Sequence, residues 1–281
     1  MAAYLRPTSL VDALAALENG AWSVVAGGTD YYPARVGRPL DDDVLDISAL
    51  PDLRAIRLTD DGWRIPALAT WSDVISAELP PIFDGLKAAA REVGGVQIQN
   101  AGTVCGNLCN ASPAADGVPP LLSLNASVEL VSQQGVSTMP LAEFALGNRR
   151  TALRPGQLMQ AVVVPASTVS RARGHFLKLG ARRYLVISIV MVGAVLEADA
   201  DGNITRAAIA VGACSEVAQR LPDLEAALVG QPAGAGLGDL VKSDHVAHLA
   251  PIDDPRGTAE YRQDAALTLC RRALAELGEV L

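Results

Sequence analysis

Two glycine-containing segments hold the residues of this sequence best suited to chemistry. They span 24–31 (Val24 to Tyr31) and 100–107 (Asn100 to Asn107). Glycine in a tight turn permits positive φ and lets backbone N–H groups approach an anion closely. Neither segment is a G-x-G-x-x-G or Walker A motif. Two such loops, if they meet, could hold a diphosphate without Lys or Arg, although each alone is also typical of an ordinary turn.

The cysteines and histidines do not form a metal-binding pattern. The four cysteines include no C-x-x-C pair, and the three histidines all follow residue 170. Zinc and iron–sulfur sites need clustered ligands at characteristic spacings. We therefore predict no metal site and no catalytic residue in this chain, so redox chemistry would need an organic cofactor or metals on another chain.

Composition excludes several classes of protein. Of the 281 residues, 50% are hydrophobic and 19% are charged, which argues against disorder and suits two or three compact units. The net charge of -8, without any run of five basic residues, argues against nucleic-acid binding. The longest apolar stretch, 185–196, is shorter than the roughly 18–20 residues of a membrane helix, and the first residues do not resemble a secretory signal. We expect a cytoplasmic protein without membrane insertion.

Apolar periodicity predicts the elements that would position the glycine segments. A helix is expected over 10–19, capped by Thr8 or Ser9, with an apolar face of Leu10, Val11, Leu14 and Leu17. A strand over 22–26 leads into the first segment. Further strands are predicted at 44–47, in a hairpin over 53–68, at 127–132 and at 160–164, with helices at 71–77 and 81–93. The small and polar residues of 98–116 predict a loop around the second segment.

The last third of the chain has a different pattern. A polar linker is expected over 165–173, followed by three strands, predicted to be antiparallel, at 176–179, 185–196 and 204–211. Two helices follow, at 221–228 and 258–277. The expected apolar side of the second helix consists of Tyr261, Ala265, Leu267, Leu269, Leu274 and Leu277.

Several short motifs together carry a resemblance to a known family. They are Ala26–Asp30, Gln97–Thr103, Gly106–Asn107, Ala111–Asp116, Leu153–Pro155, Phe176–Lys178, Arg182–Arg183 and Ala259–Arg262. In these motifs, and in their order, the chain resembles the medium, FAD-binding subunit of the molybdenum hydroxylases. That family includes xanthine dehydrogenase, carbon monoxide dehydrogenase, and bacterial aldehyde and N-heterocycle dehydrogenases.

The resemblance implies an α+β fold in three parts. A p-cresol-methylhydroxylase-type two-domain FAD-binding fold would precede a C-terminal α/β domain with an antiparallel sheet. We expect an N-terminal FAD-binding subdomain over 1–52, a middle FAD-binding subdomain over 53–165 and a C-terminal flavoprotein domain over 172–281. FAD would lie between the first two parts, partly covered by the third.

The resemblance also implies which residues contact FAD. The first segment would wrap one side of the diphosphate with Val24, Val25, Ala26, Gly27, Gly28, Thr29, Asp30 and Tyr31. The second would hold its other side with Thr103, Val104, Cys105, Gly106 and Asn107. Leu108 and Cys109 would lie against the isoalloxazine, and Val93 and Met159 would flank the adenine.

Two charged residues complete the implied site. Asp116 would accept hydrogen bonds from the cofactor's hydroxyls, and Lys178 would lie near the flavin ring. A cation there would favour the anionic reduced flavin. Tyr184 falls in the family's loop over the flavin and would gate access of the electron acceptor. Cys105 stands where the family usually has glycine, and a side chain disfavours positive φ. Either φ is negative at this position or the loop is reshaped, with the thiol as a small filler.

Three hypotheses for the function follow from the resemblance. In the first, the chain is the FAD-binding electron-transfer subunit of a molybdenum hydroxylase complex, with molybdopterin on a large subunit and [2Fe-2S] clusters on a small one, assembled as a dimer of heterotrimers. In the second, it is a self-sufficient FAD-dependent oxidoreductase of the same fold, for which no acid or base is recognisable. In the third, it is an assembly protein that has lost FAD, which the persistence of both glycine segments and Asp116 argues against.

Overall fold

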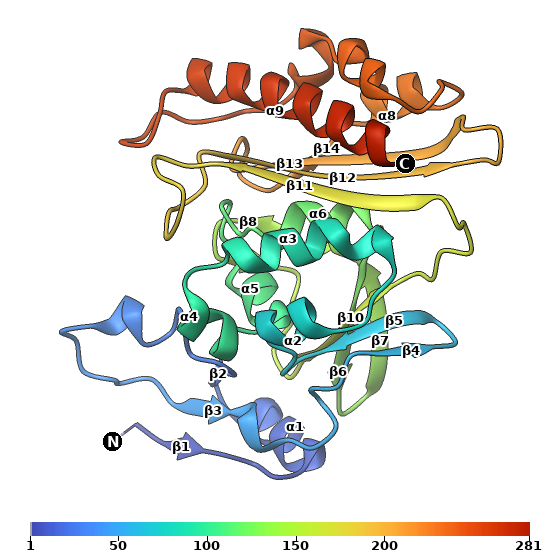
Figure 1. Ribbon diagram of the computed structural model, residues 1–281. Coiled ribbons are helices and arrows are strands. Elements are labelled where there is room, and N and C mark those ends of the chain that lie inside the picture. The colour runs from blue at the N-terminus through green and yellow to red at the C-terminus, as the bar shows by residue number, and fades with distance from the viewer. Residues whose placement is uncertain (1) are drawn as a thin grey trace.

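The N-terminal part of the computed structural model, which describes residues 2–281, is a small parallel sheet with one helix (Figure 1). Strands β1 (Tyr4–Leu5), β2 (Ser23–Val25) and β3 (Val44–Asp46) pair in the order β1-β3-β2. Helix α1 (Leu10–Asn19) begins after Ser9, whose hydroxyl accepts a hydrogen bond from the Asp12 N–H, as the sequence predicts. Two short 3₁₀ helices, η1 (Pro33–Arg35) and η2 (Ile47–Ala49), complete this unit.

The apolar face of α1 differs from the prediction at one residue. Ala13, Leu14 and Leu17 are buried, but Val11 is 77% exposed. The helical repeat of 3.6 residues places positions 13, 14 and 17 on one side, and Val11 falls outside that stripe.

The middle part is a five-stranded antiparallel sheet with short helices packed on it. The order is β4-β5-β10-β6-β7, formed by β4 (Arg57–Thr59), β5 (Gly62–Pro66), β6 (Ser127–Ser132), β7 (Gly135–Pro140) and β10 (Leu158–Val164). The hairpin predicted over 53–68 is confirmed; its expected turn at 60–62 is formed by Asp60 and Asp61, since Gly62 already pairs with Thr59. Strand β7 and the two-stranded pair β8 (Ala145–Gly147) and β9 (Arg150–Thr151) were not predicted, because β7 is largely exposed and β8 and β9 are very short.

The helices of the middle part correct the interpretation of the second glycine segment. They are α2 (Trp71–Ser76), η3 (Pro81–Phe83), α3 (Asp84–Glu92), α4 (Val96–Ala101), α5 (Val104–Asn110), α6 (Val118–Ser123) and α7 (Leu141–Phe144). The region 98–116, predicted as a loop, therefore contains the end of α4, the break at Gly102 and the whole of α5. Thr103 starts α5, because its hydroxyl accepts a hydrogen bond from the Gly106 N–H at 3.0 Å.

The C-terminal part is a four-stranded antiparallel sheet, which confirms the predicted antiparallel strands, although the second begins at residue 190 instead of 185 and the fourth was not predicted. Its strands are β11 (Ala172–Leu179), β12 (Val190–Ala198), β13 (Ile204–Gly212) and β14 (Gln219–Arg220), in sequence order. Helices α8 (Pro222–Leu228) and α9 (Ala259–Val280), with η4 (Ala235–Leu240) and η5 (Ser243–Val246), cover one face. The predicted apolar side of α9 is wrong at Tyr261, which is exposed. The buried face instead includes Ala266, Cys270 and Ala273.

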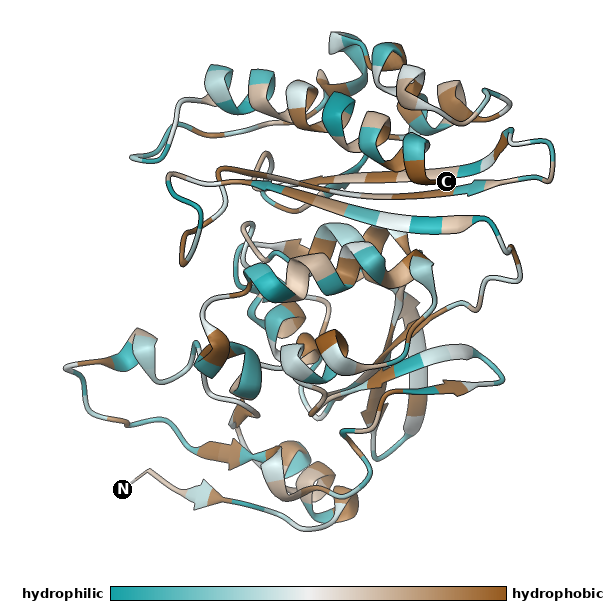
Figure 2. Ribbon diagram, in the orientation of Figure 1, coloured by the Kyte–Doolittle hydropathy of each residue, from teal (hydrophilic) through white to brown (hydrophobic). Residues whose placement is uncertain are grey.

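The C-terminal sheet is covered on both faces. Helices α9 and α8 lie above it and α3 and α6 below it in Figure 1, and hydrophobic colour runs along its inner strands in Figure 2. Every residue of β12 is buried. A Cβ built on Gly193 in β12 would lie 2.5 Å from the Pro120 nitrogen of α6. The backbone of α6 thus approaches the sheet too closely for a side chain, which fixes the C-terminal sheet against the middle part.

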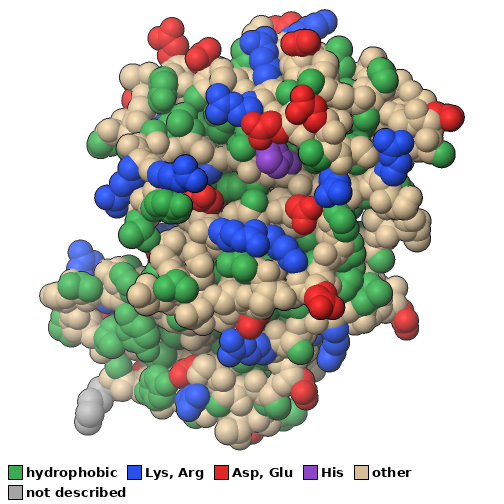
Figure 3. Space-filling view, viewed as in Figure 1, with side chains coloured by type: hydrophobic (Ala, Val, Ile, Leu, Met, Phe, Trp, Pro, Cys, Tyr) green, Lys and Arg blue, Asp and Glu red, His purple; other side chains and the backbone are tan. Residues whose placement is uncertain are grey.

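The surface carries charged side chains of both signs (Figure 3). Lys and Arg side chains are interspersed with Asp and Glu over the face in Figure 3, without a continuous basic patch there. Within residues 2–281 no helix is long and apolar enough to cross a membrane.

The contact at Gly193 generates a stability prediction. Gly193→Ala should lower the free energy of unfolding by about 1–3 kcal/mol, because the new methyl group must displace the backbone of α6. Thermal unfolding followed by circular dichroism measures the loss as a lower midpoint. Gly236→Ala is the matched control, since its Cβ would meet no atom within 4 Å. Equal midpoints for the two variants would show that α6 can move away from β12 at little cost.

Candidate cofactor site

A cleft of about 470 Å³ lies between the N-terminal unit and helices α4 and α5. Its volume is in the range of small-molecule and cofactor sites. Both glycine segments line it, as predicted. The predicted residues on its wall are Val24, Val25, Ala26, Gly27, Gly28, Thr29, Asp30, Tyr31, Val93, Thr103, Gly106, Asn107 and Cys109. Segments about 75 residues apart in the sequence therefore form one site.

The two segments meet through their backbones. A Cβ built on Gly27 would lie 1.7 Å from the Ala101 carbonyl oxygen, so only glycine permits this approach. Gly28 has φ +67°, a left-handed conformation that favours glycine, and a Cβ there would meet the Tyr32 ring at 2.6 Å. The first segment is thereby held in a tight turn at the edge of the cleft.

The start of α5 leaves a polar atom for a ligand. The Asn107 side-chain oxygen is buried and has no hydrogen-bond partner within residues 2–281. Buried polar atoms without partners are rare, because each costs free energy comparable to a lost hydrogen bond. Asn107 lines the cleft, so a donor on a molecule bound there would satisfy this oxygen. Together with the close approach of the two backbones, this fits a dinucleotide cofactor.

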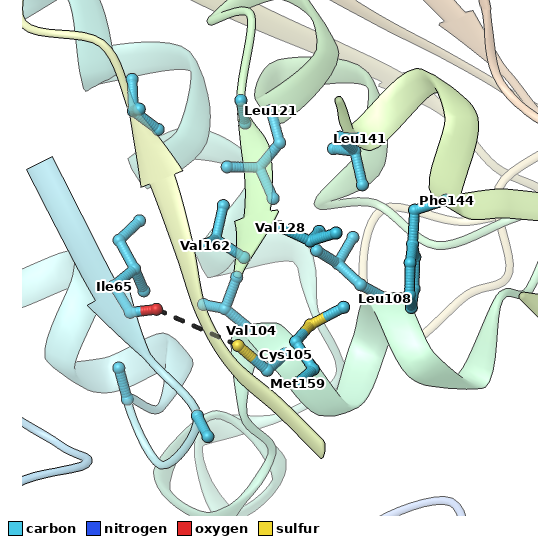
Figure 4. Packing of buried hydrophobic residues seen from close by; sticks show 14 of the residues in the cluster. Ile65, Val104, Cys105, Leu108, Leu121, Val128, Leu141, Phe144, Met159 and Val162 are labelled. Carbon is cyan, nitrogen blue, oxygen red and sulfur yellow. Dashed lines mark hydrogen bonds between the residues drawn. The ribbon is translucent and has the colours of Figure 1, made fainter. Parts of the chain in front are cut away.

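Helix α5 directs its other predicted residues into the core. Val104, Cys105 and Leu108 occupy the buried side of the helix and pack with Met159 under the sheet (Figure 4). Their side chains do not line the cleft, which differs from the contacts implied for Leu108 and Met159. The separation follows from the helical repeat, since 104, 105 and 108 lie on one side and 103, 106, 107 and 110 on the other.

Cys105 has a plain structural explanation. It lies in α5, its φ is not positive, and its sulfur approaches the Ile65 carbonyl oxygen at 3.9 Å. Burial raises the pKa of the Cys105 thiol well above its usual value, so the group stays protonated. Of the two alternatives that the sequence left open, negative φ is correct, and the thiol fills space in the core.

Asp116 and Lys178, both predicted to contact the cofactor, form a buried ion pair with each other, and neither is among the residues that line the cleft. The Lys178 Nζ lies 2.6 Å from Asp116 Oδ2, and the Ser188 hydroxyl donates to Asp116 Oδ1 at 2.6 Å. Burial raises the pKa of Asp116, while Lys178 and Ser188 act in the opposite direction. The sequence predicted two independent contacts to the cofactor. The structure shows that the lysine charge, expected to act alone on a flavin, is compensated by Asp116.

Lys178 also lines a second cavity, of about 530 Å³, between α3 and the connection from β11 to β12. Glu92 of α3 and Arg182 and Arg183 of the connection contribute further charged groups to its wall. Tyr184, predicted to gate access to the flavin, belongs to the same connection and is 63% exposed. Lys178 therefore lies on the wall of this second cavity and not on the wall of the first cleft.

Two arginines at the cleft were not predicted, since the sequence suggested a diphosphate site without cations. Arg35 stacks on the Tyr31 ring at 3.8 Å and donates to Asp42 at 2.8 Å. The Ser23 hydroxyl and Arg35 lower the pKa of Asp42 to about 2. Arg149 pairs with Asp30 at 3.2 Å. The sequence signal for Arg149 is the group Arg149, Arg150 and Arg154 between the strands predicted at 127–132 and 160–164.

Comparison with known proteins agrees with this geometry. The family model described as the FAD binding domain in molybdopterin dehydrogenase matches residues 1–167, and that of the CO dehydrogenase flavoprotein C-terminal domain matches residues 175–277. Within 2–281, no group of three or more His, Cys, Asp or Glu residues could hold a metal ion.

Three relatives illustrate the match. The nicotinate dehydrogenase FAD-subunit of Eubacterium barkeri is 34% identical over 75% of this chain and 72% of its own length. Caffeine dehydrogenase subunit beta of Pseudomonas sp. strain CBB1 is 30% identical over 98% of this chain and 94% of its own. The structure of reconstituted CO dehydrogenase from Oligotropha carboxidovorans superimposes with a TM-score of 0.86, at 26% identity over 98% of both chains.

The expected fold is confirmed by this superposition, and the resemblance read from the motifs is confirmed by the family models and the relatives. The relatives are oxidoreductase subunits, several of them named as FAD or medium subunits. The chain belongs to the family of FAD-binding medium subunits of the molybdenum hydroxylases.

Proposed function

We propose that this chain passes electrons from [2Fe-2S] clusters on a small partner subunit, through FAD, to a terminal acceptor. A large partner subunit would carry the molybdopterin centre where substrate is oxidised, and the assembly would be a dimer of heterotrimers. The observation that carries the proposal is the cleft, where two glycine segments meet and the Asn107 oxygen lies buried without a partner. Bound FAD exchanges one or two electrons, which suits it to connect one-electron clusters with a two-electron acceptor.

Several residues have proposed roles toward the cofactor. Gly27 and Gly28 would allow the diphosphate to approach the backbone, and Thr103 and Asn107 would bind it from α5. Asp116 would accept hydrogen bonds from the hydroxyls, and Lys178 would lie beside the ring. Val93 and Cys109, which line the cleft, would contact the ring systems.

The self-sufficient oxidoreductase is less well supported. It would need an acid or base at the flavin. Asp116 and Lys178, the two titratable side chains proposed to lie near the flavin, are paired with each other. The relatives that match almost the whole chain include a medium subunit and a medium chain, which are names for parts of larger complexes. In an assembly protein without FAD, the buried Asn107 oxygen would have no cofactor to supply its missing hydrogen-bond donor.

Purification of the chain alone and together with its proposed partner subunits tests the proposed function. The isolated chain should show a flavin spectrum and no hydroxylation of purines, aldehydes or N-heterocycles. Affinity purification from its source should bring a molybdopterin subunit and an iron–sulfur subunit with it. Substrate turnover by the isolated chain would refute the assignment as an electron-transfer subunit.

The diphosphate position predicts the effect of one substitution. Gly28→Val should abolish FAD binding, because the side chain would fill the approach to the backbone and strain a residue with φ +67°. Flavin absorbance relative to protein measures occupancy, and flavin should be released into the supernatant when the wild type is denatured and precipitated. Circular dichroism establishes that the variant is folded, with Gly236→Ala as control. A folded Gly28→Val protein with full flavin content would place the diphosphate elsewhere.

The Asp116–Lys178 pair predicts a redox effect that depends on both residues. Lys178→Met leaves the Asp116 carboxylate without its cation, so the pKa of Asp116 should rise further. Above that pKa, the uncompensated negative charge near the flavin should lower its midpoint potential. A change on the order of 1 kcal/mol, about 20 mV for two electrons, is expected at an effective dielectric constant near 20.

The double variant Lys178→Met/Asp116→Asn serves as the control for this redox prediction. It removes both charges and should bring the potential back toward the wild-type value, as measured by redox titration at pH 8. The single variant should also approach the wild type as the pH falls and Asp116 becomes protonated. An unchanged potential in Lys178→Met with flavin fully bound would exclude Lys178 from the ring environment.

A further inference from the structure

Arg149 is held in place at the mouth of the cofactor cleft. It lies in the turn between β8 and β9 with φ +55°, and its N–H donates to the Ala111 carbonyl at 3.1 Å. Ala111 ends α5, whose other end starts at the cleft. The backbone of Arg149 is therefore tied to the helix that lines the site, and its side chain reaches across to Asp30 of the first glycine segment.

Arg149 has most of its hydrogen-bonding capacity left. One guanidinium nitrogen, Nη1, donates to Asp30 Oδ2 at 3.2 Å, and this is the one hydrogen bond of the Arg149 side chain within residues 2–281. An arginine has five N–H donors. Arg35, the other arginine on the cleft wall, is occupied by Asp42, by the Tyr31 carbonyl at 3.1 Å and by the Tyr31 ring. Arg149 is thus the cation of the cleft with donors available to a ligand.

Asp30 makes such a cation necessary. Its carboxylate follows Gly27, Gly28 and Thr29 directly, so it lies where a diphosphate would approach the first segment. Two like charges in this position repel each other, and a neighbouring guanidinium offsets the carboxylate. Arginine also matches the geometry of phosphate oxygens with paired donors.

We infer that Arg149 is a binding residue for the diphosphate of the cofactor, which compensates Asp30 and donates its free N–H groups to the phosphate oxygens. This inference rests on the proposed position of FAD in the cleft. A different role would be that of a latch, in which the ion pair only holds the first segment against the β8–β9 turn. Exposed ion pairs of that kind contribute about 0–1 kcal/mol.

The two roles predict opposite effects of Asp30→Asn on the Kd for the cofactor. If Arg149 binds phosphate, Arg149→Gln removes an attraction and Asp30→Asn removes a repulsion. The first should then raise the Kd for the cofactor, and the second should lower it. If the pair is only a latch, both substitutions break the same contact, and both should raise the Kd by a similar factor.

The experiment measures binding of FAD, and of ADP as a probe that shares its diphosphate, to the flavin-free full chain by titration calorimetry at low and high salt. Arg149→Gln should raise both dissociation constants about tenfold at low salt and weaken their salt dependence. Asp30→Asn should lower both, and the double variant should fall between the single ones. Arg150→Gln is the matched control, because Arg150 pairs with the exposed Glu216 and does not line the cleft.

Two results would overturn the inference: wild-type affinity in Arg149→Gln, or weaker binding in Asp30→Asn by the same factor as in Arg149→Gln. Neither would affect the proposed function if the wild type binds FAD and Gly28→Val does not. Absence of FAD binding by the wild-type chain would instead refute the proposed function itself.

Discussion

The contact between the backbones of Gly27 and Ala101 is the constraint on which the cofactor site depends. With the built Cβ only 1.7 Å from a carbonyl oxygen, this approach tolerates no side chain. It places the turn after β2 against the end of α4, and the cleft is the space that remains beside it. The N-terminal and middle parts also share one hydrophobic cluster, in which Leu14 and Leu45 pack together with residues of the middle sheet. The C-terminal part has a second cluster of its own, while Val195, Ala208 and Ala210 of its sheet belong to the first. The cleft is consequently formed between two parts that are packed as one body.

Charge at the site is arranged in pairs that connect different parts of the chain. Arg149 of the middle part meets Asp30 of the N-terminal part, and Lys178 of the C-terminal sheet meets Asp116 of the middle part. The second pair is buried, and removal of one partner from a buried pair is costly because the other charge remains without compensation. Each charge in these two pairs is therefore compensated by its partner and held in a fixed position. This arrangement is consistent with a chain of net charge -8 that binds an anionic dinucleotide.

Much of the fold could be predicted from the sequence, and the exceptions have physical causes. The apolar runs of β12 and β13 and the hairpin of β4 and β5 were visible, because burial and turn residues mark them directly. Helices α4 and α5 were not, since six or seven small and polar residues carry too little periodicity and the cap at Thr103 fixes the start of α5. The glycine segments were recognised as a site from residue types and motif order. Lys178 of β11 and Asp116, which lies between α5 and α6, are 62 positions apart in the sequence. Their pairing depends on how these elements pack, which no local pattern encodes.

The two sides of α5 explain why this chain tolerates a cysteine where its family usually has glycine. Position 105 faces the core with negative φ, so a small side chain fills space beneath Ile65 without reaching the cleft. Position 106 is different, because a Cβ there would lie 2.8 Å from the Thr103 hydroxyl oxygen that caps the helix. A larger residue at 106 would disturb the cap and the wall of the cleft together, whereas a change at 105 is absorbed by the core. The cysteine thus stands at the position of α5 that does not line the cleft, whereas Gly106 does.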